Sequence, residues 1–331
     1  MLELDGSAGG GQLLRTALSL SAVTGTPFEM SDVRGARDDP GLRPQHLTAV
    51  EVLAAVTDAA VEGAEPGATE LTFRPGPPQP GHYEADIGTA GSLALLFDAL
   101  LPLAVELDAP LSLAATGGTD VQWSPTAAHY RRVKLPLLRR HGLAAAVDEA
   151  RPGFYPAATL YLAPSRPEPL ALRERTAFAG ARVYSTAATE LADAGVARRQ
   201  ADAAAERLAD AGLDPVERVV RTGDADCPGS AVCVRLDYGT GVAGFDALGE
   251  RGTPAEEVGA AAADGAVAFD AGPGAVDGYL ADQLVVVLAL AGGTVRVPAV
   301  TDHVRTAVEL VGEFGRDVTV EERERGALLS A

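Results

Sequence analysis

The chain carries the stretch GGGQLLRTALSLSAV at residues 9–23, in which a glycine-rich turn leads into an aliphatic run. The same pattern recurs twice: Gly88 and Gly91 precede an apolar run over residues 92–105, and Gly278 precedes one over residues 279–290. Runs that are apolar on most faces are typical of helices packed against a sheet. The sequence therefore predicts three similar helices, each entered through glycine.

A second helix and further strands are predicted after each of these three helices. The second helices are expected over residues 45–60, 126–140 and 302–314, and the β-like segments behind them over residues 70–74, 144–162 and 316–322. The first two units keep one register, since 81 residues separate Gly10 from Gly91 and also Gln45 from Thr126. Self-similarity at a fixed spacing indicates a repeated structural unit.

The third unit begins later than this spacing requires. The extra segment, residues 178–270, has its own alternation of predicted strands and helices. We therefore predict an α+β fold in which three repeated two-helix/four-strand units form the main domain, residues 1–177 and 271–331. A small α+β domain, residues 178–270, is expected to be inserted before the third unit.

The chain is strongly acidic, with 46 Asp and Glu against 27 Lys and Arg and a formal net charge of −19. This balance argues against a general nucleic-acid coat or a binder of anionic membranes, although it leaves room for a local basic site. Only one of the basic residues, Lys134, is lysine. Such a composition favours a protein adapted to concentrated salt, and an ordinary acidic enzyme from a GC-rich genome is the alternative.

No feature of the sequence indicates export, a membrane span or a structural metal. The two cysteines, Cys227 and Cys233, have no Cys or His pair at zinc spacing beside them. The N-terminus has no basic segment, and Asp98 interrupts the longest apolar run before it reaches the ~18 residues of a span. We expect a cytoplasmic protein with neither a disulfide framework nor a structural metal site.

One histidine is placed for chemistry. His303 follows Thr301 and Asp302, a plausible helix N-cap, so its ring is expected in the first helical turn. The positive end of the helix dipole disfavours imidazolium and leaves a ring nitrogen free to attack a phosphate. The alternative is an ordinary helix-start residue. His82 is expected on a solvated loop, and His129 and His141 on the surface of a basic helix that also carries Lys134.

Arginines gather beside glycine turns near the N-terminus. Arg34, Arg37 and Arg43 lie in one glycine- and proline-containing segment, and Arg15 lies upstream. Guanidinium groups suit bidentate capture of phosphate, and charge pairing with nearby aspartates is the alternative. Glycine loops such as residues 9–11 allow close backbone approach to phosphates, although the chain has no Walker A motif.

Taken together, these motifs resemble the RNA 3′-terminal phosphate cyclase family. The matching strings are Leu4-Asp5-Gly6-Ser7, Gly9-Gly10-Gly11-Gln12-Leu13-Leu14-Arg15, Arg34 and Arg37, Pro40-Gly41-Leu42, Gln45-His46-Leu47-Thr48-Ala49-Val50, Ile87-Gly88-Thr89-Ala90-Gly91-Ser92, Gly117-Gly118-Thr119-Asp120, Gly153-Phe154-Tyr155-Pro156, Tyr279-Leu280-Ala281-Asp282-Gln283-Leu284, and Thr301-Asp302-His303 with Thr306. They span nearly the whole chain. The resemblance implies three two-helix units with a small inserted domain.

The resemblance also implies an ATP-dependent ligase. In this family ATP adenylylates a histidine, AMP passes to an RNA 3′-phosphate, and the 2′-hydroxyl closes a 2′,3′-cyclic phosphate and releases AMP. His303 is then the expected nucleophile, and Mg²⁺ or Mn²⁺ is expected to screen the triphosphate. The expected ATP-binding residues are Tyr279, Leu280, Ala281, Asp282, Gln283 and Asp98, and those for the RNA end or phosphates are Arg15, Arg34, Arg37, Gln45 and His46.

The chain departs from the family pattern at two places near the expected site. Ala8 stands where a glutamate, a candidate metal contact, is typical, so the metal contact is unassigned; Asp98 stands where a glutamine is usual. The alternative function is that of the non-catalytic, RNA-binding relatives that act in ribosome assembly, which lack the histidine. An enolpyruvyl transferase is disfavoured, because its similar units number six.

Overall fold

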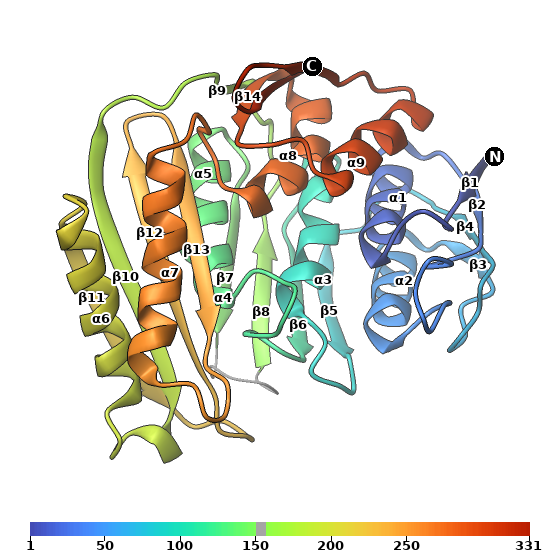
Figure 1. Cartoon of the computed structure of the whole chain (residues 1–331). Helices are drawn as coiled ribbons and strands as arrows, with labels where there is room; N and C mark the ends of the chain where they lie inside the picture. The colour runs from blue at the N-terminus through green and yellow to red at the C-terminus, as the bar shows by residue number, and fades with distance from the viewer. Residues whose placement is uncertain (150–156) are drawn as a thin grey trace.

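The computed structural model describes residues 1–149 and 157–331. The predicted string Gly153-Phe154-Tyr155-Pro156 lies outside these residues. Within them, helices combine with four four-stranded sheets, each containing both parallel and antiparallel pairs. The prediction of a mixed α+β chain is confirmed. Figure 1 shows one sheet at the side of the N-terminus, one at the opposite side, and helices α1, α3 and α8 between them.

The first sheet is built by the N-terminal residues. Its elements are β1 (Leu2–Asp5), α1 (Gly11–Thr24), β2 (Phe28–Ser31), α2 (Pro44–Thr57), β3 (Ala60–Glu62) and β4 (Leu71–Arg74). The strand order is β1-β2-β4-β3, in which β1 and β2 are parallel and the other pairs antiparallel. α1 and α2 match their predicted positions to within three residues at each end.

The second sheet follows directly and has the same pattern. Its elements are β5 (Gly81–Asp86), α3 (Leu93–Leu100), the 3₁₀ helix η1 (Leu101–Val105), β6 (Leu111–Thr116), α4 (Ala127–His129), the π-helical turn η2 (Tyr130–Lys134), α5 (Leu135–Arg140), β7 (Ala145–Glu149) and β8 (Ala157–Leu162). The order is β5-β6-β8-β7, with β5 and β6 parallel. The predicted helix over residues 92–105 tightens into 3₁₀ geometry at Leu101, next to Pro102, which cannot donate a backbone hydrogen bond.

The third sheet draws its strands from both sides of the long segment 178–270. Its elements are β9 (Leu170–Leu172), α8 (Gly278–Ala291), β14 (Gly293–Val297), α9 (Asp302–Glu313), β15 (Thr319–Glu322) and β16 (Ala327–Ser330). The order is β15-β16-β14-β9, and β9 is parallel to β14. β9 was not predicted, because three residues are too short to show an alternating pattern.

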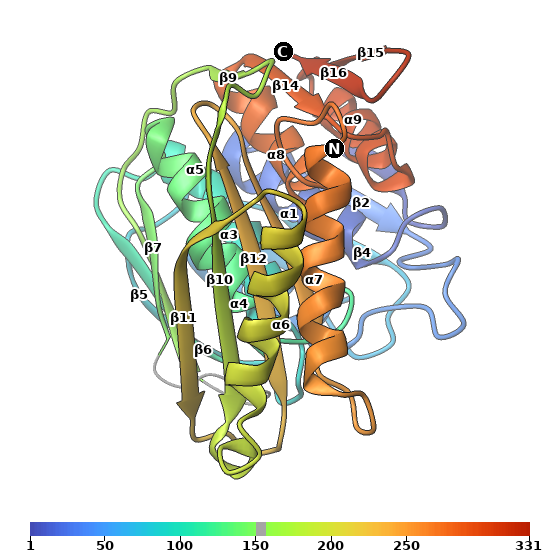
Figure 2. The ribbon, with the colours of Figure 1, turned by 60° about the vertical axis from the view of Figure 1, so that its left-hand side comes forward.

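The fourth sheet is formed within residues 178–270. Its elements are β10 (Phe178–Ala188), the 3₁₀ turn η3 (Thr189–Leu191), α6 (Val196–Asp210), β11 (Pro215–Gly223), β12 (Ser230–Tyr238), β13 (Val242–Leu248) and α7 (Ala255–Asp270). The order is β11-β10-β12-β13. α6 and α7 lie side by side on one face of this sheet (Figure 2), and they share with it an apolar core separate from that of the rest of the chain.

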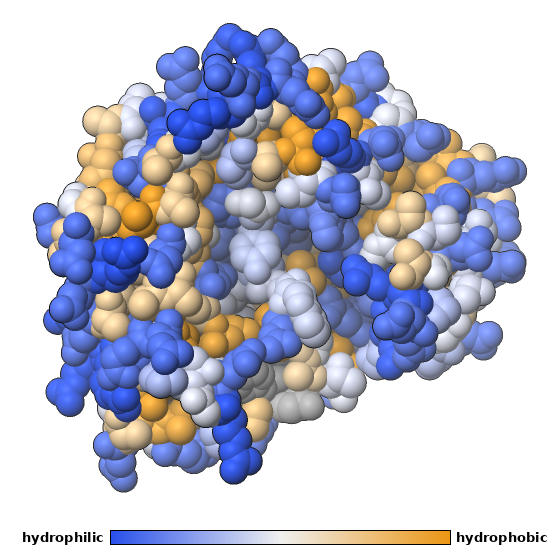
Figure 3. Space-filling model, in the orientation of Figure 1, coloured by the Kyte–Doolittle hydropathy of each residue, from blue (hydrophilic) through white to orange (hydrophobic). Residues whose placement is uncertain are grey.

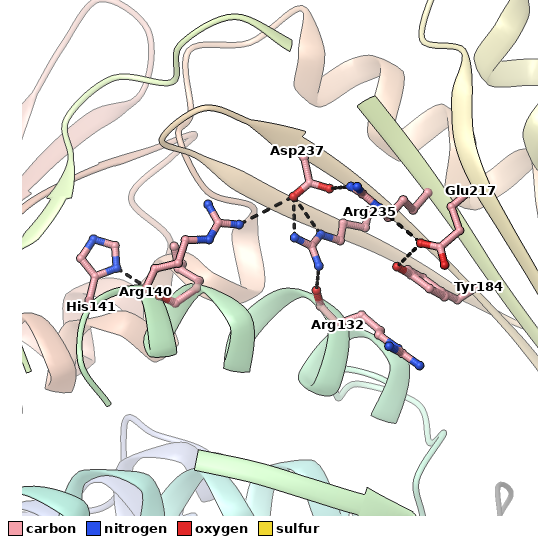
Figure 4. Close-up of polar contacts among 9 residues, drawn as sticks. Arg132, Arg140, His141, Tyr184, Glu217, Arg235 and Asp237 are labelled. Carbon is pink, nitrogen blue, oxygen red and sulfur yellow. Dashed lines mark hydrogen bonds and ion pairs between the residues drawn. The ribbon is translucent and has the colours of Figure 1, made fainter. Parts of the chain in front are cut away.

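A network of arginines joins the fourth sheet to the helix that runs from α4 to α5 (Figure 4). Asp237 on β12 accepts hydrogen bonds from Arg182 and Arg235, and the guanidinium of Arg140 on α5 lies 3.7 Å away. Arg235 also donates to the backbone carbonyl of Arg132. Asp237 is only 8% exposed, whereas the arginine side chains that it holds are between 13% and 39% exposed, so the carboxylate is the buried centre of a partly buried network.

The Asp237→Asn variant is expected to lower the free energy of unfolding by about 2–3 kcal/mol, because it leaves partly buried guanidinium groups without their counter-charge. Urea denaturation measures this change. The matched control is Arg207→Ala, which breaks an ion pair with Asp264 on the outer faces of α6 and α7. Both of its side chains are about half exposed, so the control should shift the free energy by no more than ~0.5 kcal/mol. Equal losses in the two variants would contradict the prediction.

Candidate active site

The N-termini of α1, α8 and α9 meet around one cavity of about 1010 Å³. Figure 3 shows this face of the molecule hollowed near its centre, between the helices of the first sheet and the fourth sheet. Backbone N–H groups at the start of a helix have no partner within the helix and attract anions. The cavity therefore has a physical basis for binding phosphate groups.

Glycine at the start of α1 lets the arginine segment close over the helix. An ideal Cβ on Gly11 would lie 1.9 Å from Nε2 of His46, and one on Gly10 would lie 2.8 Å from a guanidinium nitrogen of Arg37. Neither position can carry a side chain without moving these groups. The two sequence motifs, separated by some thirty positions, thus form a single wall of the cavity.

The arginines of this wall have different partners. Arg34 donates to the backbone carbonyls of Asp39 and Gly41 at 2.9 and 2.8 Å, so it also holds its own loop together. Arg43 pairs with Asp39. Within the described part of the chain, the guanidinium of Arg37 has no hydrogen bond or ion pair, although its backbone N–H donates to Arg34, and Arg37 lines the cavity. Internal pairing therefore describes Arg34 and Arg43, whereas Arg37 is available for phosphate capture.

His46 is held in the neutral form at this wall. Burial lowers its pKa to about 3, and the positive charges of Arg15, Arg34 and Arg43 add to the shift. Its Nδ1 accepts a hydrogen bond from the backbone of Arg43 at 3.3 Å, which leaves the proton on Nε2. His46 can therefore donate one hydrogen bond near the start of α1.

The floor of the cavity is a cluster of buried charges. Lys134, only 1% exposed, donates to Asp98 and to Oε1 of Gln283 at 2.9 Å. Burial lowers the pKa of Arg15 to about 10, with Asp98 and Asp282 opposing the shift. Arg15 therefore stays charged at neutral pH and contributes positive charge to the floor.

Asp282 behaves differently from Asp98. Burial raises its pKa to about 7; Lys134 opposes the shift, and the charge of Asp98 adds to it. Among the described residues its Oδ1 is buried and has no hydrogen-bond partner. Asp282 thus presents an unsatisfied polar atom at the cavity, which an occupant of the cavity can satisfy.

A buried histidine supports the start of α8. His129 Nε2 lies 3.1 Å from Asp277 Oδ2, which also accepts from Gly244 N, while Asp277 Oδ1 caps α8 through Leu280 N. Burial alone would lower the pKa of His129, but Asp277 outweighs it and the pKa is raised. The ring of Tyr279 packs edge-on against that of His129, with 5.6 Å between centroids. This arrangement fixes the helix end that carries Tyr279.

His303 lies in the first turn of α9, as the sequence predicts. Thr301 is the N-cap, and its Oγ1 accepts a hydrogen bond from Val304 N at 3.2 Å. The His303 side chain is exposed and lines the cavity.

Ten of the twelve predicted site residues line the cavity. They are Arg15, Arg34, Arg37, Gln45, His46, Asp98, Tyr279, Asp282, Gln283 and His303. Leu280 and Ala281 are the exceptions and require a correction: both are fully buried in the apolar core and do not line the cavity. Successive residues of a helix point about 100° apart, so a continuous string cannot present every side chain to one side.

The sequence patterns did not predict the positions of three residues at or beside the cavity. His129 was expected on a solvated face and is fully buried. Lys134 was interpreted as part of the same surface helix, but the π-helical turn η2 shifts the register and brings it inward. Trp123, the single tryptophan of the chain, lies at the cavity and was not considered. Its occurrence as a lone tryptophan in a chain poor in aromatics was the available signal.

Comparison with known proteins accords with this geometry. The family model described as RNA 3′-terminal phosphate cyclase matches residues 7–320. The chain belongs to this family. The resemblance drawn from the sequence motifs is thereby confirmed, and the match includes both walls of the cavity and His303.

Relatives of this RNA 3′-terminal phosphate cyclase family cover the chain almost completely. A protein of Halobacterium salinarum named RNA 3′-terminal phosphate cyclase is 47% identical over 344 positions, covering 99% of each chain. One of the same name from Pyrococcus furiosus is 39% identical, covering 95% of this chain and 93% of its own. Among solved structures, the enolpyruvyl transferase NikO from Streptomyces tendae matches at 18% identity with a TM-score of 0.28, covering 50% of this chain and 33% of its own.

None of the helices in the described residues is both long and apolar enough to span a bilayer. Both cysteines are free.

The depressed pKa of His46 predicts a pH-dependent contribution to stability. Between about pH 3 and the unfolded value of 6.5, the unfolded state binds more protons at this residue than the folded state. The free energy of unfolding should therefore fall as pH falls through this window, by at most about 1.4 kcal/mol per pH unit. Relative to wild type, His46→Asn should lose less stability between pH 7 and pH 5 in urea denaturation. Parallel losses in the two proteins would rule out this contribution.

Proposed function

We propose that the protein converts an RNA 3′-terminal phosphate to a 2′,3′-cyclic phosphodiester at the expense of ATP. Its relatives bear the name of this activity, and it comes to this chain through membership of their family. The observation that supports the proposal most is the meeting of His303 with the arginine wall around one cavity, at the starts of three helices. ATP and RNA 3′-phosphate ends are the proposed substrates, and the cytoplasmic location stays a prediction.

The proposed reaction has three displacements. A ring nitrogen of His303 attacks the α-phosphorus of ATP, and pyrophosphate leaves. An oxygen of the RNA 3′-phosphate then attacks the phosphorus of the histidine-bound AMP and releases the histidine. The 2′-hydroxyl finally loses its proton and attacks the 3′-phosphorus, and AMP leaves. The adenylate is needed because an oxygen of an uncapped terminal phosphate is a poor leaving group.

The arginine wall, together with Arg15 of the floor, is suited to stabilise the negative charge on the phosphate oxygens in these steps. Arg15 is charged and largely buried, the guanidinium of Arg37 has no partner within the described residues, and His46 donates from Nε2. Donors fixed before the reaction stabilise negative charge on phosphate oxygens without having to reorganise. We therefore assign these three residues, with Arg34 and Gln45, to the phosphates and the RNA end.

The α8 side of the cavity suits the adenylate. Tyr279 offers a partly exposed ring, and Gln283 has its Oε1 occupied by Lys134, so its amide N–H groups are left to donate. Asp282 brings an unsatisfied oxygen, and Asp98 is held by Lys134. We propose that these four residues bind ATP, whereas Leu280 and Ala281 only hold the helix in the core.

The family resemblance implies a divalent cation, and the residues present fit a cation that is bound by one carboxylate together with substrate phosphates. No group of three or more His, Cys, Asp or Glu side chains in residues 1–149 and 157–331 is arranged to hold a metal ion. Mg²⁺ commonly binds through one or two carboxylates together with substrate phosphates. The unsatisfied Oδ1 of Asp282 fits such a single contact. When bound, Mg²⁺ or Mn²⁺ would screen the charge of the triphosphate.

We also propose that the first three sheets are copies of one two-helix/four-strand unit. In each, one pair of neighbouring strands is parallel and the next two pairs are antiparallel, in equivalent order. On this proposal the main domain comprises residues 1–177 and 271–331, and residues 178–270 are a small inserted domain. Its separate apolar core and its bounds at the start of β10 and the end of α7 support this division.

The covalent intermediate gives the first test of the activity. Incubated with α-labelled ATP and a divalent cation, the wild-type protein is expected to retain acid-labile label, and His303→Ala is expected to retain none. His82, which is exposed like His303 but lies outside the cavity, provides a matched control: His82→Ala should label as wild type does. A wild-type protein that takes up no label would instead support the non-catalytic, RNA-binding alternative.

Arg37 gives the second test. Because its guanidinium has no partner within the described residues, Arg37→Ala should change the free energy of unfolding by less than ~0.5 kcal/mol. Loss of a charged hydrogen bond to phosphate should raise KM for RNA 3′-phosphate roughly 10–100-fold. Steady-state kinetics and urea denaturation measure the two effects. Unchanged kinetics with a lowered stability would contradict the assigned role.

A further inference from the structure

Trp123 is the most exposed large apolar residue in the described part of the chain. It is the only tryptophan, and its side chain is 91% exposed. Among the residues that the structure describes, the next most exposed aromatic ring is that of Tyr161, at 47%. Indole is a large apolar surface that proteins ordinarily bury or cover with a partner. The exposure of Trp123 therefore indicates that a bound ligand covers the indole.

The loop that carries Trp123 is anchored on both sides. Gln122 donates to Glu250 at 2.9 Å, and Thr126 donates to Asp246 through its backbone N–H and its hydroxyl, both at 2.9 Å. Both acceptors lie at or just beyond β13 of the fourth sheet. Trp123 itself has φ +59°, a left-handed conformation that is an outlier for a bulky residue. The surrounding contacts thus hold the indole in solvent at a backbone conformation it would not choose alone.

The ring lies at the cavity and not on a remote surface. Trp123 lines the cavity with its neighbours Ser124 and Pro125, which are buried. Tyr279 lines the same cavity. Small ligands lose most of their surface to the pocket that binds them, so they are contacted mainly by buried groups. A side chain that is almost wholly exposed at such a cavity is suited to a ligand that extends out of it.

We propose that Trp123 is a stacking platform for a nucleobase near the 3′ end of the RNA substrate. The proposal rests on the proposed function, which places the RNA terminus in the cavity and its remaining nucleotides outside. Every base presents a π-face, so stacking of this kind is tolerant of sequence. The adenine of ATP is the competing occupant. The α8 residues assigned to the adenylate are much less exposed than Trp123, with Tyr279 at 38% and Asp282 and Gln283 partly buried, which favours the RNA base for the exposed ring.

Stacking also suits an acidic protein in concentrated salt. Binding through phosphate contacts weakens steeply as salt rises, because it depends on the release of counterions. Contact between an indole and a base carries no net charge and is not screened in this way. A single aromatic platform therefore retains RNA under conditions in which an exposed basic surface would not.

Because the chain has one tryptophan, fluorescence excited at a wavelength that tyrosine does not absorb reports on this residue alone. A short RNA with a 3′-phosphate, added without ATP, should quench the emission, and ATP added without RNA should not. The same RNA with its last two nucleotides abasic keeps the phosphate but has no base to stack, and should leave the emission unchanged. Quenching by ATP alone, or equal quenching by the intact and abasic RNA, would overturn the proposal.

Kinetics of variants separate this proposal from the proposed function. Trp123→Ala should raise KM for RNA about tenfold, the loss expected for one stacked base, while kcat and histidine adenylylation by ATP stay as in wild type. Trp123→Phe should restore most of the affinity. Tyr161→Ala, which removes an exposed ring on β8 away from the cavity, should leave KM unchanged. If all variants label with AMP but share one KM, the stacking role fails and the cyclase activity stands; absence of label in the wild type defeats the activity itself.

Discussion

The site depends on the close approach between the start of α1 and the segment that carries His46 and Arg37. A Cβ at Gly11 would occupy the position of the His46 ring, so a side chain there would push the arginine segment away from the helix. The contact has an electrical consequence as well. It buries His46 beside Arg15, Arg34 and Arg43, and this burial, with the added effect of their positive charges, lowers the pKa of His46 and keeps the imidazole neutral. One absent side chain thus sets the shape of this wall and the protonation state within it.

The floor of the cavity is organised around the buried ammonium group of Lys134. An ammonium group as deep as that of Lys134 is costly unless it is paired and hydrogen-bonded. Asp98 supplies the charge and Gln283 the second acceptor. Because Lys134 can only donate, it also fixes which end of the Gln283 amide faces the cavity. Asp282, with no comparable partner, has a pKa raised towards neutrality.

Local sequence patterns predicted much of the fold but only part of the site. The glycine-entered helices, the N-cap at Thr301 and the bounds of α9 could be found because each depends on neighbouring residues. The burial of Lys134 and His129 could not be predicted in this way. Their helix looks like a basic surface helix, and only a π-helical turn and the packing of Gly244 against His129 make them internal. Leu280 and Ala281 were assigned to the pocket as part of a string, although helical periodicity directs them into the core.

The net charge of −19 and the basic cavity are compatible because they act over different distances. At ~1 M salt the Debye length is about 3 Å, so acids elsewhere on the surface scarcely repel a phosphate that enters the cavity. The same screening weakens exposed arginines such as Arg43, and it reaches buried charges much less. Arg15 and Lys134, both largely removed from water, therefore keep their influence where surface charges lose it. In concentrated salt, the electrostatics of this site depend on its buried cations more than on the number of arginines around its mouth.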